Sequence, residues 1–147
     1  MILHAGLIAM RSGGVWRGAL ITGSSGVGKT DLMLRALDCG FRLVADDRTL
    51  AWILDGRLYG RAPDTLGGLM ELRGIGMIGE PALPVAEIAL VLRCEDEQSE
   101  VERMPEPEFQ QIEGLAVPLL HAHALDASAP AKLGRALIRL GHDNRPA

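Results

Sequence analysis

Short apolar runs separated by turn residues follow one another along much of the chain, and this pattern predicts strands joined by turns. Residues 2–10 are expected to form a strand that is interrupted at Ala5-Gly6. Ser12-Gly13-Gly14 then predicts a turn, after which residues 15–22 return as a second strand. The two strands are therefore expected to pair as a hairpin at the start of the domain.

Two segments show helical spacing instead. Residues 29–39 place leucine and alanine among good helix formers, and Gly40 supplies a C-cap. Residues 128–141 are amphipathic, with Ser128 as the expected N-cap and Gly141 as the expected end. Three leucines share the apolar face of this second helix: Leu133, Leu137 and Leu140.

The remaining apolar runs predict further strands. Residues 41–45 form one that runs into two carboxylates, and residues 48–60 form a hairpin around an Asp55-Gly56 turn. Residues 66–72 fit either a short helical or an extended piece. Two more strands are expected, at residues 85–94 and 115–120. Together these elements predict an α/β fold with a mixed β-sheet around the first helix.

The stretch between the second strand and the first helix fits the phosphate-loop pattern G-x-x-x-x-G-K-[ST]. Its glycines let the backbone turn sharply and aim N–H groups at an anion, and its lysine adds a mobile positive charge. The hydroxyl at its last position is the one that ligates Mg²⁺. Because strand, loop and helix come in the required order, bound phosphates would meet the positive end of the helix dipole. The predicted nucleotide site consists of Gly23, Ser24, Ser25, Gly26, Val27, Gly28, Lys29 and Thr30.

Two adjacent carboxylates, Asp46 and Asp47, follow the strand after the first helix. Carboxylates at the carboxyl edge of a sheet, beside a phosphate loop, can bind Mg²⁺ or accept a proton. Each also raises the pKa of the other unless a cation intervenes, which suits a general base that works near neutral pH. The alternative is a turn with two solvated aspartates, but the neighbouring phosphate loop favours a functional role.

Other residues give weaker signals. His4 lies in the first predicted strand, where a lone histidine is more often structural than catalytic. Glu71 and Arg73 are two apart on one side of a strand, and an ordinary ion pair explains them equally well. His121 and His123 permit a shared face, but no third ligand supports a metal site.

Composition narrows the class of protein. The 147 residues suffice for one domain, and with 48% hydrophobic but 3% aromatic residues its core must be aliphatic. The 15 basic and 19 acidic residues give a net charge of −4, which argues against a general nucleic-acid binder. There is no signal-peptide pattern and no apolar run of membrane-spanning length, so we expect a cytoplasmic protein without a membrane partner. Cys39 and Cys94 lack metal or disulfide spacing and are expected to be buried thiols.

Four motifs together resemble the catalytic domain of the HPr kinase/phosphorylase family. They are, in order over about residues 1–80, His4-Ala5-Gly6, the phosphate loop at 23–30, Val44-Ala45-Asp46-Asp47 and Glu71-Leu72-Arg73-Gly74-Ile75-Gly76. A phosphate loop alone does not specify the reaction, whereas the loop with the paired aspartates and E-x-R-G-x-G is highly specific. These bacterial enzymes phosphorylate a serine of HPr, the phosphocarrier protein of the sugar phosphotransferase system. The resemblance implies a P-loop kinase domain of the HPr kinase and phosphoenolpyruvate carboxykinase type.

The resemblance also implies a role for each motif. Asp46 would be the base that deprotonates the HPr serine, and Asp47 and Thr30 would lie close to Mg²⁺. Lys29 would hold the phosphates of ATP. His4 would lie beside Asp46 and the transferred phosphoryl group, which reverses the structural interpretation of that histidine. The signature residues would shape the active site and contact another subunit or HPr: Glu71, Arg73, Gly74 and Gly76.

The chain also departs from the family pattern. Full-length members carry an N-terminal regulatory domain, whereas we expect a single domain over residues 1–147, with a core at 1–127 and a helix at 128–141. The basic tract after the signature and a later R-P-G-R-N-like segment are both absent. Those parts bear on oligomer contacts, HPr engagement and the reverse reaction, so we expect kinase activity and regard phosphorylase activity as doubtful. The family is hexameric, and the short form leaves a homo-oligomer open.

Two other functions stay open at this point. A non-catalytic sensor would bind ATP or ADP and act through a signalling partner. The intact Lys29, Thr30, Asp46 and Asp47 favour an enzyme over a sensor, since a sensor needs no base. A small-molecule kinase would require a lid or domain for a second substrate, and so short a chain shows no sign of one.

Overall fold

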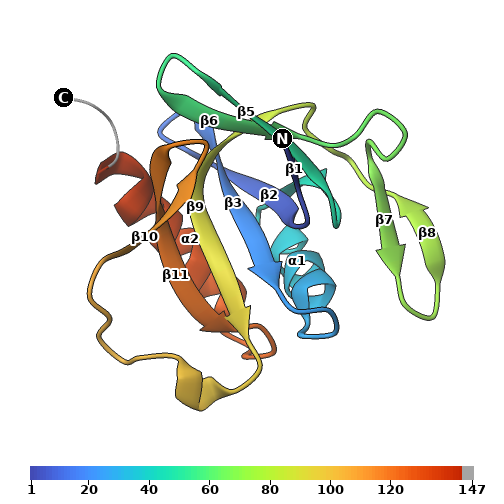
Figure 1. The fold of residues 1–147 in the computed structure, drawn as a ribbon. Helices are drawn as coiled ribbons and strands as arrows, with labels where there is room; N and C mark the ends of the chain where they lie inside the picture. Colours follow the sequence, from blue (N-terminus) through green and yellow to red (C-terminus); the bar gives the residue numbers. More distant parts are fainter. Residues whose placement is uncertain (144–147) are drawn as a thin grey trace.

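A computed structural model describes residues 1–143, in which a mixed β-sheet forms the centre of the domain (Figure 1). Its strands are β1 (Ile2–Leu3), β2 (Gly6–Ser12), β3 (Val15–Gly23), β4 (Arg42–Ala45), β5 (Thr49–Leu54), β6 (Arg57–Arg61), β9 (Ala86–Glu95), β10 (Glu108–Ile112) and β11 (Leu115–His123). The other elements are the hairpin β7 (Leu69–Leu72) and β8 (Gly76–Gly79), the helices α1 (Lys29–Leu37) and α2 (Ala129–Asp143), and a 3₁₀ turn at Gln98–Glu100.

Neighbouring strands of the sheet follow the order β1-β5-β6-β9-β3-β2-β4. The start of β9 pairs with β6, and its second half pairs with β11, which in turn pairs with β10. The β7–β8 hairpin is a separate two-stranded sheet that projects to one side of the molecule (Figure 1).

Both helices pack on the same face of the sheet. Leu32 and Met33 of α1 and Leu133 and Leu137 of α2 are buried in one cluster with aliphatic side chains of β2, β3 and β9. Two hairpins of the same sheet cover the opposite face of its central strands. Side chains of the β5–β6 and β10–β11 hairpins form a second buried cluster there with side chains of β2, β3 and β9. Full burial of one such side chain contributes about 1.5–3 kcal/mol, so the two clusters hold the central strands firmly.

The strand directions bring several strand ends to one edge of the sheet. β3 runs parallel to β9, and β9 runs parallel to β11. β2 is antiparallel to both β3 and β4, so β4 also runs in the direction of β3. The segments that follow β3, β4, β9 and β11 therefore all leave the sheet at the same edge, where ligands of α/β proteins commonly bind.

Most of the predicted elements are confirmed. The opening hairpin forms with Gly6 opposite Ile21, and β5 and β6 form the hairpin around Asp55-Gly56. The piece at residues 66–72 is extended rather than helical at its end, where it becomes β7. The part of the chain that the structure describes contains no helix long and apolar enough to cross a membrane.

Several local predictions are wrong. His4 lies in a bend between β1 and β2 and not within a strand. The second helix passes through Gly141 and ends at Asp143, because one helical glycine costs only about 1 kcal/mol relative to alanine. Cys94 is buried as expected, but Cys39 is exposed just beyond α1. The predicted place of Leu140 on the apolar face lies outside the described side chains.

His121 on β11 joins the two ends of the acidic loop between β9 and β10. Its Nδ1 lies 2.7 Å from Oε1 of Glu95, and its Nε2 lies 3.2 Å from Oε1 of Glu108. The hydrogen bond with Glu95 is the main cause that raises the pKa of His121; burial opposes the rise and Glu108 adds to it. The two histidines of β11 therefore have separate acidic partners, since Nδ1 of His123 lies 2.9 Å from Oδ1 of Asp126.

This contact predicts a pH-dependent contribution to stability. Because folding raises the pKa of His121, its contribution is complete below the pKa of the unfolded chain and is lost as pH rises through the folded-state pKa. We expect His121→Gln to lower the free energy of unfolding by roughly 0.5–1 kcal/mol near pH 5.5, and by less near pH 8.5. Urea denaturation at the two pH values measures this difference. An equal loss at both values would contradict the charged contact.

Candidate functional site

The phosphate loop connects the end of β3 to the first turn of α1. Gly23 and Gly28 have φ values of 138° and 107°, in the left-handed region that favours glycine. A Cβ on Gly23 would lie 2.8 Å from the carbonyl oxygen of Cys94 on β9, and one on Gly28 would lie 2.9 Å from Cδ2 of Leu125. The backbone conformation therefore calls for glycine at both positions, and at Gly23 the β9 backbone leaves no room for a side chain either.

Lys29 is the first residue of α1, and its side chain folds back along the loop. Nζ lies 2.5 Å from the carbonyl oxygen of Gly23, so the ammonium group is held within the loop. Val27 is buried and anchors the loop to the helical side of the core, while Thr30 is half-buried in the first turn of α1. The exposed part of the loop consists of Ser24, Ser25 and Gly26. A positive group, a helix N-terminus and an accessible backbone thus occur together, as anion binding requires.

Asp46 and Asp47 follow directly after β4, at the same edge of the sheet. Asp46 is half-buried, and its Oδ2 accepts a hydrogen bond of 3.1 Å from the backbone N–H of Glu71. Asp47 is exposed and has a φ of 64°, a conformation that aspartate tolerates better than most residues. The N–H of Arg48 donates to the carbonyl oxygen of Asp46 at 2.7 Å and closes the turn. The two adjacent aspartates therefore differ: one is held by a hydrogen bond and the other faces solvent.

Burial raises the pKa of Asp46 above its ordinary value, because the charged form loses hydration. The hydrogen bond from the Glu71 backbone acts in the opposite direction, and the negative charges of Asp47 and Glu71 raise the pKa further. A carboxylate whose pKa lies closer to neutrality is a better general base. The neighbouring aspartate thus contributes as the sequence indicated, but burial is the larger cause.

His4 leaves the sheet at the edge that carries the phosphate loop and the aspartates. Gly6 pairs with Ile21 and Leu7 pairs with Ala45, so the residues before Gly6 extend past the end of β4 and are level with the last residues of β3. The Thr49 hydroxyl donates to the carbonyl oxygen of Ala5 at 2.8 Å and fixes this bend. The His4 side chain is exposed. The expectation that His4 lies beside Asp46 and the transferred phosphoryl group stays a prediction.

The signature stretch forms the β7–β8 hairpin. Glu71 lies in β7, Gly76 begins β8, and Arg73 and Gly74 lie in the exposed turn between them. The expectation that Glu71 and Arg73 share one side of a strand is therefore wrong, because the chain turns after Leu72. The backbone of Glu71, and not its side chain, makes the hydrogen bond to Asp46.

Comparison with known proteins identifies the family. Residues 2–124 match the family model of the HPr Serine kinase C-terminal domain. The chain belongs to this family. The match spans the phosphate loop, the paired aspartates and the signature hairpin. It confirms the resemblance drawn from the four motifs.

Individual relatives of the HPr serine kinase domain share part of their length with this chain. The HPr kinase/phosphorylase of Limosilactobacillus reuteri (strain DSM 20016) is 38% identical over 131 residues, which cover 82% of this chain and 39% of that protein. The HPr kinase/phosphorylase of Clostridium tetani (strain Massachusetts / E88) is 44% identical over 66 residues, 45% of this chain and 22% of that protein. The chain thus spans well under half the length of these curated relatives.

A solved structure supports the fold. The chain superimposes on the Hpr(Ser) kinase/phosphatase from Coxiella burnetii with a TM-score of 0.76 and 24% identity, covering 97% of this chain and 96% of that one. The α/β fold of the HPr kinase type, with a mixed sheet around the phosphate-loop helix, is therefore confirmed.

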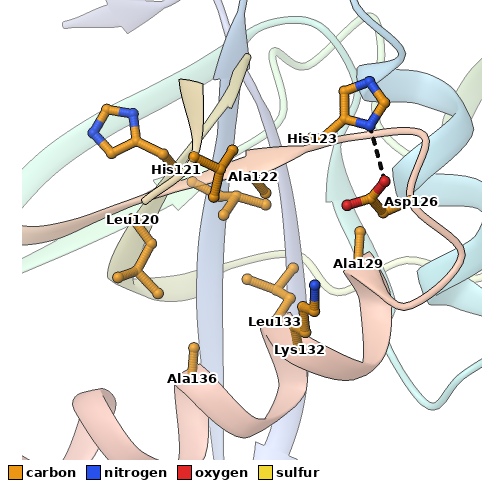
Figure 2. Close-up of a pocket in the computed structure, with 11 residues that line it drawn as sticks. Leu120, His121, Ala122, His123, Asp126, Ala129, Lys132, Leu133 and Ala136 are labelled. Carbon is orange, nitrogen blue, oxygen red and sulfur yellow. Dashed lines mark hydrogen bonds and ion pairs between the residues drawn. The ribbon is translucent and has the colours of Figure 1, made fainter. Parts of the chain in front are cut away.

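The structure of this family domain also brings a segment to the phosphate loop that the sequence pattern did not indicate. The turn after β11 carries Leu125, whose side chain approaches Gly28. Figure 2 shows His123 and Asp126 at the two ends of this turn, joined by their hydrogen bond, beside a pocket between β11 and α2. The sequence shows no sign of this contact, because Leu125 comes about 95 residues after the phosphate loop and belongs to no recognised motif. The two segments come together only through the pairing of β3, β9 and β11.

The surroundings of Asp46 allow us to predict how its carboxyl group titrates in the protein without nucleotide or metal. We expect the pKa of the Asp46 carboxyl group to lie above the ordinary aspartate value, and Asp47→Asn to lower it by removing a neighbouring negative charge. Asparagine suits the left-handed conformation at position 47, so the backbone should be retained. Carbon-13 NMR titration of the side-chain carboxyl measures both values. An unchanged pKa in the variant would show that the two aspartates do not interact.

Proposed function

We propose that this domain transfers the γ-phosphoryl group of ATP to a serine of an HPr-type phosphocarrier protein, in a Mg²⁺-dependent reaction. The observation that carries the proposal is the half-buried carboxyl of Asp46, with its raised pKa, at the sheet edge that holds the phosphate loop. A phosphate loop alone fits many nucleotide-binding functions, whereas a base at the same edge supports transfer to a hydroxyl group. The names of the relatives support an HPr-type protein as the acceptor.

The loop would bind the phosphates through its backbone and its lysine. The N–H groups of the loop and the N-terminus of α1 supply fixed positive potential at no cost of reorganisation. Lys29 Nζ would exchange its contact with the Gly23 carbonyl for a phosphate oxygen, which is a better partner because it carries negative charge. Transfer then depends on positioning and charge neutralisation more than on covalent chemistry by the protein.

Asp46 would accept the proton of the attacking serine. The Glu71 N–H leaves the second carboxylate oxygen of Asp46 available and fixes the rotation of the group. His4, at the same edge, would lie beside the transferred phosphoryl group. The other signature residues would shape the site and contact HPr or a second subunit: Arg73, Gly74 and Gly76.

The donors at this edge suit Mg²⁺. The Thr30 hydroxyl and the Asp47 carboxylate are hard oxygen ligands, which this ion prefers. Within residues 1–143 no group of three or more His, Cys, Asp and Glu side chains is arranged to hold a metal ion. That agrees with Mg²⁺ at nucleotide sites, where one or two protein oxygens bind and phosphates and water complete the shell. Bound Mg²⁺ would neutralise charge on the phosphates. A cytoplasmic location would follow from an HPr-type partner. The proposal leaves open whether the domain acts as a monomer or as a homo-oligomer.

The base assignment predicts the effect of Asp46→Asn. The asparagine side chain retains an oxygen that can accept the Glu71 N–H but cannot take a proton from serine. We expect transfer of labelled γ-phosphate from ATP to HPr to fall by roughly 10²–10⁴-fold, while the affinity for ATP changes little. Transfer is measured on purified HPr from the same genome, and affinity by calorimetry.

A matched control is Asp55→Asn, which changes an exposed aspartate of the Asp-Gly turn at the other end of β5 and should leave both quantities unchanged. Normal transfer by Asp46→Asn would refute the role of this carboxylate as the base. Full ATP binding by the unmodified protein with no transfer to any HPr-type protein would instead support a nucleotide sensor.

A further inference from the structure

The turn that follows β11 places an exposed apolar side chain beside the phosphate loop. Leu125 is 59% exposed, yet its Cδ2 lies 2.9 Å from the position that a Cβ on Gly28 would occupy. The Ala124 Cβ lies 3.4 Å from the same position. Leu125 therefore sits against the last glycine of the phosphate loop and still presents most of its surface outward.

The turn is tied to the helix that begins at the phosphate loop. Nη1 of Arg35 on α1 donates to the carbonyl oxygen of Asp126 at 3.0 Å, and its Nη2 donates to the carbonyl oxygen of Ala124. Nε of the same guanidinium group lies 2.7 Å from Oδ1 of Asp31, one turn earlier on the helix. One arginine thus holds the carbonyls on both sides of Leu125, so the leucine keeps a fixed position relative to the loop.

The turn is also closed on itself, so that its shape does not depend on a ligand. The Asp126 N–H donates to the carbonyl oxygen of His123 at 3.1 Å, and Oδ1 of Asp126 meets Nδ1 of His123 at 2.9 Å (Figure 2). The N–H of Ala129, at the start of α2, donates back to the Asp126 carbonyl at 3.0 Å. A preorganised turn of this kind gives up little conformational entropy when a ligand packs on it.

The strand order brings the turn and the phosphate loop to neighbouring positions at one sheet edge. β3, β9 and β11 are parallel neighbours, and the phosphate loop follows the first while the turn follows the third. Two strand spacings are about 10 Å at the backbone, and the Leu125 side chain reaches across this interval, since its Cδ2 comes close to Gly28. A nucleotide with its phosphates in the loop can therefore place its ribose and base against the exposed surface of Leu125.

We propose that Leu125 forms the nucleoside-binding wall of this site, by packing against the ribose and base of the nucleotide whose phosphates occupy the loop. The inference rests on the proposed nucleotide binding and adds the residue that recognises the nucleoside. Leu125 has no group that attracts phosphate, so its contribution is restricted to the apolar surface of the nucleoside. The site should thereby prefer a nucleotide to an inorganic polyphosphate of the same charge.

The test compares two ligands with and without a nucleoside. Calorimetry with Mg²⁺ measures the affinity of the full chain for ADP and for inorganic pyrophosphate, which matches ADP in phosphate number and approximately in charge near neutral pH. We expect Leu125→Ala to weaken ADP binding about tenfold, since truncation removes most of the apolar contact, and to change pyrophosphate binding less than about twofold. Leu125→Met, which conserves volume, should restore ADP binding to within about threefold of the unmodified chain.

Leu54→Ala is the matched control, because Leu54 is 57% exposed and lies beside the Asp55-Gly56 turn at the distal end of β5. It should alter neither affinity, and circular dichroism checks that every variant keeps its fold. Unchanged ADP affinity in Leu125→Ala, or equal losses for the two ligands, would overturn the inference and leave the proposed kinase function intact. Failure of the unmodified chain to bind ADP and ATP would overturn the proposed function and this inference with it.

Discussion

The close parallel pairing of β3 with β9 is the constraint on which the rest of the site depends. A Cβ on Gly18 would lie 2.5 Å from the carbonyl oxygen of Glu87, and one on Gly23 would lie 2.8 Å from that of Cys94, so the β9 backbone excludes side chains at one position within β3 and at its last residue. β9 in turn carries β11 on its other side. Any shift in this pairing would move the phosphate loop away from the turn that holds Leu125, because both leave the sheet from strands held by β9.

The second organising feature is the combination of a preorganised anion site with a carboxyl group whose pKa is raised by burial. The loop attracts negative charge through its backbone, the α1 dipole and Lys29, whereas Asp46 is held partly out of water. These opposite electrostatic environments lie at one sheet edge because β4 runs in the same direction as β3. The Glu71 N–H connects this edge to the projecting hairpin, so the orientation of the Asp46 carboxylate depends on where the hairpin lies.

The residues that we propose for phosphoryl transfer all lie within the matched domain of about 125 residues, although its curated relatives are much longer. The phosphate loop, the aspartates and the hairpin all lie in the matched region. The turn at Leu125 is at the end of that region, and α2 follows it and covers the core through Leu133 and Leu137. Helix α2 accordingly helps to fix the turn that carries Leu125, since the N–H of Ala129 at its start donates to the carbonyl oxygen of Asp126.

The sequence by itself determined the elements and motifs whose signals are local. The glycines of the loop, the Asp55-Gly56 hairpin and the apolar strands each carry their own conformational preference, and the four motifs identified the family. Tertiary structure alone decided what depends on contacts between distant segments: the burial that dominates the pKa of Asp46, the bond from the Glu71 backbone, and the approach of Leu125 to the loop. Strand order sets these contacts, and it follows from how whole faces pack together, so no short stretch of residues encodes it.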